Sequence, residues 1–303
     1  MAVLGLVANA SDLYYVISWA ENQGPLFSPI LAGSVLRVPL RGGAPTLVAS
    51  GFMFTRPVLT TSSVLLGERN TYPNANRDAI VSIPLPGDAT SGGATLASMD
   101  TLIAGPVTDG SNVYFADSAG IEAVTLADGS AAATVVTIVP YTCNTMAVFG
   151  QRLLFILPQG SVNSVPLPPQ AGSPIASLGT CAPGPALLMP CGSDACWLDE
   201  GANAMMRMDP AGGPMATIPL QGSLTSPLDV AFDGSNFYTI GGNSGVTERL
   251  ARMALDGSGS TILATMPASG GGSVAVDDAC VYWGNALGIF SLAKTAAGPF
   301  TQQ

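Results

Sequence analysis

The chain has 303 residues, of which 48% are hydrophobic and only 10% are charged, and its formal net charge at pH 7 is −10. An acidic surface of this kind repels phosphate backbones and anionic lipid, so we expect no nucleic-acid partner. No window reaches the roughly 18 to 20 uninterrupted apolar residues that a membrane helix needs, so we expect no membrane insertion.

Histidine is absent from the chain, and this absence excludes a large part of enzyme chemistry. A Ser-His-Asp or Cys-His nucleophile, an imidazole general base and histidine-containing metal sites are all ruled out. Glycine-rich phosphate loops and calcium loops with alternating carboxylates are also missing. We therefore expect neither a cofactor nor a metal site.

Internal repetition is the main structural signal. The end of an apolar stretch, a three-residue turn and a strand recur seven times, as in "TDGSNVYFAD" (108–117), "FDGSNFYTIG" (232–241) and "VDDACVYWGN" (276–285). The second residue of the strand after the turn marks each repeat. In chain order the markers are Tyr14, Leu65, Tyr114, Leu154, Cys196, Tyr238 and Tyr282, and the distance between them ranges from 40 residues (Tyr114 to Leu154) to 51 (Tyr14 to Leu65).

Each repeat continues with two more strands around a Gly/Pro turn, as in "RLARMALDGSGSTILAT" (249–265). Four short strands in a repeat of about 40 to 50 residues match the blade of a β-propeller. We predict an all-β, seven-bladed β-propeller with four antiparallel strands per blade, named a to d from the centre outwards. The predicted blades cover 3–56, 57–105, 106–145, 146–184, 185–226, 227–271 and 272–303, and together they form a single domain over 1–303.

Repeats such as "VAVDDACVYWGNALGIFSLAK" resemble the propeller repeats of exported bacterial proteins, loosely of the NHL, YVTN and TolB-like kind. The resemblance covers nearly the whole chain and implies the propeller fold, whereas it carries over no functional residue. The N-terminal "MAVLGLVANA" aligns with a strand a and has no basic region, so we do not interpret it as a signal peptide. The last repeat is expected to end with a strand d in "GPFTQQ".

Repeats 1 and 2 are longer than the others because each has an insertion between strands b and c. The predicted insertions span 18–33 and 67–79, on the propeller face that also carries the d-to-a connections. Polar loops on a rigid scaffold are where binding residues usually lie, and arginine suits a carboxylate or phosphate. The candidate ligand-binding residues are Trp19, Glu21, Asn22, Arg69, Asn70, Tyr72 and Arg77.

Two alternatives to a binding role stay open for this face. The insertions could only cap the channel or pack on each other. A histidine-free lyase, hydrolase or synthase-like enzyme could also use a carboxylate general base at the channel mouth, with Glu21 and Glu68 as candidates. The aromatic residues of strand b could form a sugar platform, but their recurrence at one blade position favours packing between blades.

The five cysteines suggest two disulfides. Cys191 and Cys196 flank one hairpin turn, at the positions of Asp109 and Tyr114 in another repeat, and can face each other across it. Cys143 and Cys181 occupy matching d-to-a connections, which makes a bridge between adjacent blades plausible and leaves Cys280 as the one free thiol. Two bridges indicate an oxidising compartment, so we expect a secreted, periplasmic or cell-surface protein.

These observations favour an exported, monomeric, non-catalytic binding or scaffold protein. We expect its partner, a small molecule, a glycan or a protein, to bind on the face that carries 18–33 and 67–79.

Overall fold

A computed structural model describes residues 2–21, 30–51, 53–69, 77–85, 93–126, 133–136, 145–168, 174–181, 187–199, 201–220, 227–243, 247–267, 272–296 and 299–301. The regular secondary structure of these residues consists of β-strands. The chain divides into two compact units, Met1–Thr134 and Val135–Gln303, which are described separately below as unit 1 and unit 2.

Unit 1 carries the first three blades. Blade 1 consists of β1 (Ala2–Ala8), β2 (Asp12–Glu21), β3 (Ile30–Pro39) and β4 (Thr46–Gly51). Blade 2 consists of β5 (Met53–Phe54), β6 (Val58–Leu59), β7 (Ser63–Arg69), β8 (Asp78–Pro84) and β9 (Ala94–Met99). Blade 3 consists of β10 (Ala104–Thr108), β11 (Asn112–Ala116), β12 (Ile121–Thr125) and β13 (Ala133–Val136), where the boundary between the units falls.

Unit 2 carries the other four blades. Blade 4 consists of β14 (Thr145–Phe149), β15 (Arg152–Ile156), β16 (Ser161–Pro166) and β17 (Ala176–Thr180), and blade 5 of β18 (Leu188–Cys191), β19 (Asp194–Asp199), β20 (Ala204–Met208) and β21 (Ala216–Pro219). Blade 6 consists of β22 (Pro227–Phe232), β23 (Asn236–Asn243), β24 (Thr247–Ala254) and β25 (Thr261–Pro267), and blade 7 of β26 (Gly272–Val276), β27 (Cys280–Asn285) and β28 (Gly288–Ala293).

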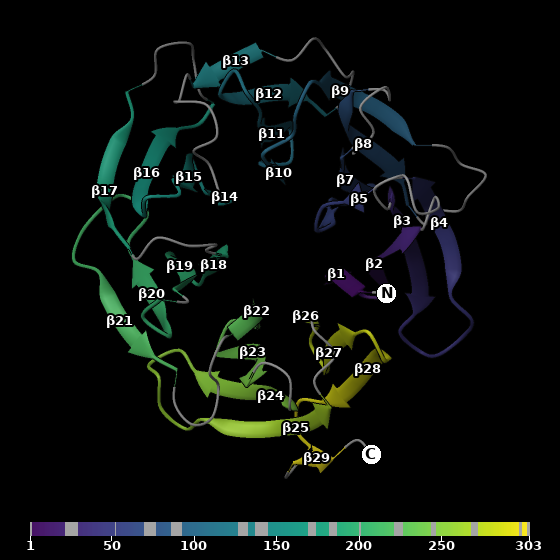
Figure 1. The fold of residues 1–303 in the computed structure, drawn as a ribbon. Helices are drawn as coiled ribbons and strands as arrows, with labels where there is room; N and C mark the ends of the chain where they lie inside the picture. The colour runs from purple at the N-terminus through teal and green to yellow at the C-terminus, as the bar shows by residue number, and fades with distance from the viewer. Residues whose placement is uncertain are drawn as a thin grey trace. The chain divides into compact units, whose positions relative to one another are not determined.

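Seven sheets of mainly four antiparallel strands confirm the predicted all-β, seven-bladed β-propeller. Within unit 2 the first strands, β14, β18, β22 and β26, lie on the inner side of their sheets (Figure 1). The predicted single domain over 1–303 stays a prediction.

The C-terminal strand is not where the sequence suggested. β29 (Phe300–Thr301) does not add a fourth strand to blade 7 but pairs in parallel with β25, so that Ala264 faces Phe300 at the outer edge of blade 6. Blade 7 therefore has three described strands and blade 6 has five. The expectation that "GPFTQQ" supplies strand d of blade 7 was wrong, because an exposed outer edge accepts a short strand in either direction.

Strand b of most blades is buried on both faces, which explains its continuous apolar sequence. In β7, Val64 and Leu66 pack in the cluster shared with blade 1, whereas Leu65 between them packs in the cluster shared with blade 3. In β19, Trp197 faces blade 4 while Cys196 and Leu198 face blade 6. The recurrent strand b aromatics are thus core residues, as predicted.

The turn between strands a and b is closed by a recurrent side-chain hydrogen bond. The hydroxyl groups of Tyr114, Tyr238 and Tyr282 donate to the carboxylates of Asp109, Asp233 and Asp277, five residues earlier, over 2.6, 3.0 and 2.7 Å. The other carboxylate oxygen of each Asp accepts backbone amides of the turn, for example those of Ser111 and Asn112 at 2.8 and 2.7 Å. We call this arrangement the Asp–Tyr lock.

Blade 5 closes the same turn with a disulfide. Cys191 and Cys196 are bonded, with their Cα atoms 5.8 Å apart, which confirms the predicted bridge. The two residues are diagonal neighbours and not directly opposed, because Cys191 pairs with Asp194 and Cys196 with Met189. The spacing of five residues matches that of the Asp–Tyr lock, so the bridge replaces the lock covalently.

The second predicted bridge is corrected by the structure. Cys181 has a free thiol, whose Sγ donates to the carbonyl oxygen of Gly160 at 3.2 Å, so it is not bonded to Cys143. Cys143 itself lies outside the described residues. Cys280 is free as predicted. The prediction was wrong because matching sequence positions in two repeats do not make two side chains face each other. A disulfide requires that they do.

The Asp–Tyr lock predicts a measurable loss of stability when one hydroxyl is removed. Tyr114→Phe should lower the free energy of unfolding by about 1 kcal/mol, because the Asp109 carboxylate at this exposed turn position loses a donor while it keeps its amide partners. Tyr15→Phe is the matched control: Tyr15 is also a buried tyrosine of unit 1, without a lock. Denaturant unfolding of both variants checks this, and equal losses would contradict it.

Candidate functional site

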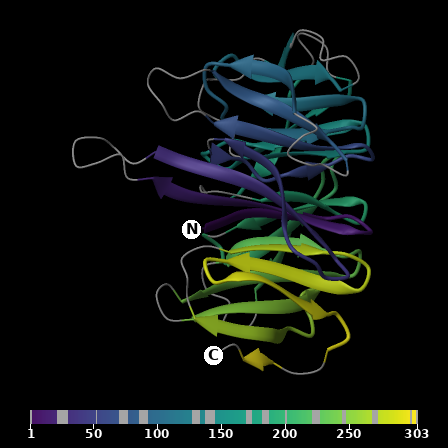
Figure 2. The same ribbon diagram turned by 90° about the vertical axis from the view of Figure 1, so that its right-hand side faces the viewer.

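The two predicted insertions are partly strand. Figure 2 shows β2 and β3 projecting as a long hairpin from unit 1. Trp19 pairs with Ala32 and Glu21 with Ile30, so only 22–29 of the first insertion lies outside the ladder and the described residues. In the second insertion β7 continues to Arg69 and β8 begins at Asp78. The described parts of both insertions therefore extend strands b and c of their blades.

The predicted ligand-binding residues divide into a described and an undescribed group. Asn22, Asn70 and Tyr72 lie outside the described residues, and only the backbone of Glu21 is described. Trp19 lies half-buried on β2, Arg69 is half-buried at the end of β7, and Arg77 is exposed just before β8.

Arg69 and Arg77 both reach the connection between blades 2 and 3. Arg69 Nη2 donates to the carbonyl oxygen of Ile103 at 2.6 Å, and its buried Nε has no hydrogen-bond partner among the described residues. Arg77 Nε lies 3.4 Å from Asp100 Oδ1, in an ion pair whose side chains are 69% and 79% exposed. Such a pair contributes little to stability and leaves Arg77 accessible.

A third residue at the base of the second insertion holds the same connection. The buried carboxylate of Asp78 accepts the backbone amide of Leu102 at 2.7 Å. The two arginines are thus brought together on one segment, as the binding interpretation requires. Some of their hydrogen-bond donors already contact that segment, which also agrees with the alternative that the insertions only pack on their surroundings.

The candidate general base Glu68 is constrained by blade 1. A Cβ atom at Gly51 in β4 would lie only 2.4 Å from Glu68 Oε1, so the carboxylate packs against a backbone that a side chain could not approach. The side chain of Glu21, the other candidate, is not among those described. No pair of carboxylates is therefore assembled here by described residues.

Buried acids elsewhere near the ends of strands a, b and c hold polypeptide in place. Asp117 accepts the amides of Ala119 and Gly120, and Asp199 accepts that of Ala202 at 2.8 Å. Between blades 6 and 7, Asp229 accepts the Ser273 hydroxyl at 2.6 Å and the Val274 amide at 2.8 Å. These bonds satisfy the carboxylates in a way that suits a scaffold.

The single lysine of the chain lies in an arrangement that sequence reasoning missed. Lys294 Nζ lies 3.0 Å from Asp233 Oδ2 and 5.7 Å from the centre of the Tyr238 ring. Its carbonyl oxygen accepts Arg252 Nη1 at 3.0 Å. Lys294 follows blade 7 and the other three residues belong to blade 6, so the ion pair joins the two blades. The one sequence feature that could have drawn attention to this residue is that it is the single lysine of the chain.

The charge states of the lock follow from these contacts. Burial alone would raise the pKa of Asp233, but bonds from the Asn236 amide, Lys294, the Ser235 amide and Tyr238 outweigh it and lower the pKa to about 2. Burial, and next to it the bond to Asp233, raise the pKa of Tyr238 to about 12. In the same way hydrogen bonds outweigh burial and lower the pKa of Asp109 and Asp277. A lowered pKa makes a carboxylate a weaker base at neutral pH.

The described residues also line an open cavity of about 490 Å³ between blades 4 and 5 of unit 2. None of its lining residues had been singled out from the sequence. Within the described part of the chain, no group of three or more Cys, Asp or Glu side chains is arranged to hold a metal ion. The same residues include no helix with the length and hydropathy of a membrane span.

No protein-family model and no curated protein sequence matches the chain. Among solved structures it is similar to TolB from Acinetobacter baumannii, at 15% identity and a TM-score of 0.53 over 82% of this chain and 62% of that one. It is also similar to the WD40 β-propeller domain of Doa1, at 12% identity and a TM-score of 0.66 over 97% and 93% of the two chains. A third similar structure is a puromycin-hydrolysing peptidase from Mycobacterium tuberculosis, at 13% identity and a TM-score of 0.62 over 97% and 52%.

These similarities define the chain as a β-propeller repeat protein, in agreement with the resemblance found in its sequence. The chain spans less than two thirds of the TolB and peptidase chains. At such identities the similarities establish the fold, which is shared by proteins with different activities.

The lowered pKa of Asp233 predicts a specific loss of stability in acid. A carboxylate with a depressed folded-state pKa stabilises the protein above its ordinary pKa of 3.8 and loses this effect as the pH falls towards about 2. After allowance for solvent screening we expect about 1 kcal/mol from this group. In Asp233→Asn, therefore, the decrease in unfolding free energy between pH 4 and pH 2 should be smaller than in the parent protein. The exposed turn residue Asp278 provides the control, Asp278→Asn, and an unchanged acid slope in Asp233→Asn would contradict the prediction.

Proposed function

We propose that the protein is a non-catalytic binding or scaffold propeller that binds its partner through the b–c insertions 18–33 and 67–79. The observation that supports this most directly is the placement of Arg69 and Arg77 at the base of the second insertion. Arg69 is held by its hydrogen bond to the Ile103 carbonyl oxygen, and Arg77 is accessible beside Asp100. The two guanidinium groups therefore form a cationic surface at the base of this insertion. Carboxylate or phosphate groups suit such a surface, whether on a small molecule, a charged glycan or an acidic protein segment.

Binding is better supported than catalysis by what the described acids do. The buried acids discussed above accept amides or hydroxyl groups that fix the connections, and the contacts of Asp109, Asp233 and Asp277 lower the pKa of each carboxylate. A general base of the kind proposed for Glu21 or Glu68 needs the opposite, a carboxylate with a raised pKa close to a reacting group. The enzyme interpretation therefore has no described feature in its favour.

The proposal also covers the setting in which the protein works. The Cys191–Cys196 disulfide suits an oxidising compartment, so we propose a secreted, periplasmic or cell-surface protein. The acidic chain is proposed to act as a monomer, without a nucleic-acid partner and without membrane insertion.

Inorganic phosphate is a suitable probe for the insertion face, because it carries the anionic oxygens without a further recognition element. Phosphate titration followed by calorimetry should give an affinity about tenfold weaker for the double variant Arg69→Gln/Arg77→Gln than for the parent protein, since two guanidinium groups are lost. Arg41→Gln removes an exposed arginine from the turn between β3 and β4, at the other end of blade 1, and should leave the affinity unchanged.

The same phosphate affinity in the parent protein and the double variant would overturn the proposed site. So would a decrease of the same size in Arg41→Gln, because it would reduce the effect to net charge. Thermal unfolding of all three proteins separates either result from a failure to fold.

A further inference from the structure

The cavity between blades 4 and 5 is built from turns of both blades. Gln151 and Arg152 come from the turn between β14 and β15 and the start of β15, and Leu167 follows β16. Ser193 lies in the turn between β18 and β19, and Asp209 in the turn after β20. The whole site therefore lies within unit 2, at the end of these blades that carries the a–b and c–d turns.

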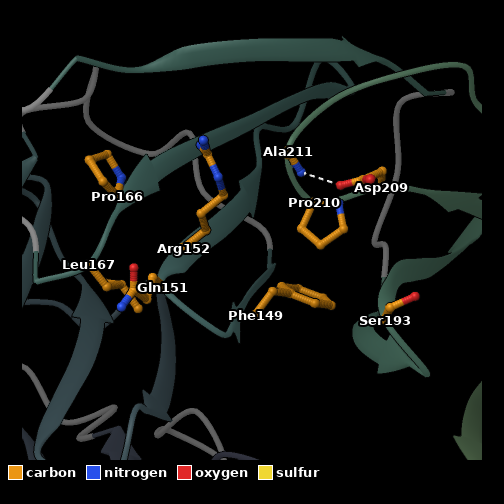
Figure 3. A pocket seen from close by; sticks show the side chains of 9 residues that line it. All are labelled: Phe149, Gln151, Arg152, Pro166, Leu167, Ser193, Asp209, Pro210 and Ala211. Carbon is orange, nitrogen blue, oxygen red and sulfur yellow. Dashed lines mark hydrogen bonds between the residues drawn. The ribbon is translucent and has the colours of Figure 1, made fainter.

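Part of the cavity lining is apolar. Phe149 closes the end of the apolar cluster that joins the two blades, in which Trp197 and Met208 are also buried. Figure 3 shows the Phe149 ring between Leu167 on the blade 4 side and Ser193 on the blade 5 side. Pro166, Pro210 and Ala211 add further non-polar wall. A volume of about 490 Å³ lies within the range of small-molecule sites, which combine apolar walls with a few polar groups.

Arg152 supplies the only cation among the lining residues. Its Nη1 donates to the Ser164 hydroxyl at 3.2 Å, and none of the ion pairs of the described residues includes it. A neutral hydroxyl positions the guanidinium without neutralising it. The planar guanidinium therefore keeps donors for a carboxylate, which it can bind through two parallel hydrogen bonds.

The single acid of the lining limits the charge of the ligand. Asp209 Oδ1 accepts the Ala211 amide at 2.7 Å, and the turn is closed by the Gly212 amide at 2.9 Å from the Asp209 carbonyl oxygen. This carboxylate stands on the blade 5 side, whereas Arg152 comes from blade 4 (Figure 3). A second anionic group directed towards blade 5 would meet like charge.

We propose that this cavity is a second binding site, for a small molecule with one carboxylate and a flat apolar body. The carboxylate pairs with Arg152, and the apolar body lies against Phe149 and the proline walls. The site is independent of the insertion face, because it shares no residue with it.

Benzoate and benzamide form a matched pair of probes, since they have the same shape and differ in charge. Titrations followed by saturation-transfer NMR should show that the parent protein binds benzoate about tenfold more tightly than benzamide. Arg152→Gln should weaken benzoate binding about tenfold and leave benzamide binding unchanged. Ala211→Trp places a large side chain from an exposed turn position into the cavity and should abolish binding of both probes.

Three outcomes would overturn the proposal: no binding of either probe, equal affinity of the parent protein for both probes, or unchanged benzoate binding in Arg152→Gln. Thermal unfolding confirms that each variant is folded. The double variant Arg69→Gln/Arg77→Gln serves as a separate arm. It should bind benzoate like the parent protein, so that a failure of the insertion site and a failure of the cavity site are told apart.

Discussion

The side-chain bond that closes the turn between strands a and b in blades 3, 5, 6 and 7 is the interaction on which the packing of these blades depends. Strand b has to bury one face against the preceding blade and the other against the following one within a unit, so a slip of one residue would exchange the two faces. The Asp–Tyr lock ties the third residue of strand b to the residue that follows strand a and to the turn amides, which fixes that register. Blade 5 replaces the lock with the Cys191–Cys196 disulfide at the same spacing.

The lock of blade 6 also takes part in the contact with blade 7. In blade 6 the Asp233 carboxylate accepts Tyr238 and pairs with Lys294, which belongs to the end of blade 7. One carboxylate thus serves the turn of its own blade and the contact with the next. The net effect is a depressed pKa for Asp233 and a raised pKa for Tyr238, both of which keep the lock intact over the range between about pH 4 and pH 10.

The fold could be predicted from the sequence because its determinants are local and repeated. Turn residues at a fixed distance before Tyr114, Tyr238 and Tyr282 and apolar runs after them recur in the chain, and the hydrophobic pattern assigns the strands. The position of β29 could not be predicted, because the choice between the outer edges of β25 and β28 depends on long-range pairing. Cys181 failed as a disulfide residue for a related reason: its direction depends on the bond to Gly160, which the sequence does not encode locally.

The candidate sites were predictable only in part. A long insertion with two arginines in an arginine-poor chain is visible in the sequence, but the shared contact of Arg69 and Arg77 with residues 100–103 depends on the neighbouring blade. The cavity beside Arg152 had no sequence signal, since turn residues of two blades form it and each turn by itself has ordinary composition. The candidate sites thus depend on contacts between blades, whereas the fold depends on features of each repeat.

The most direct test of the account is to exchange one Asp–Tyr lock for a disulfide. If the lock and the bridge occupy equivalent geometry, Asp109→Cys/Tyr114→Cys should oxidise spontaneously, and denatured protein should still contain the three free thiols of the parent chain. As a control, Asp109→Cys/Phe115→Cys directs the second thiol to the other face of strand b and should contain five free thiols. Five free thiols in Asp109→Cys/Tyr114→Cys after air oxidation would contradict the claim that one geometry closes these turns.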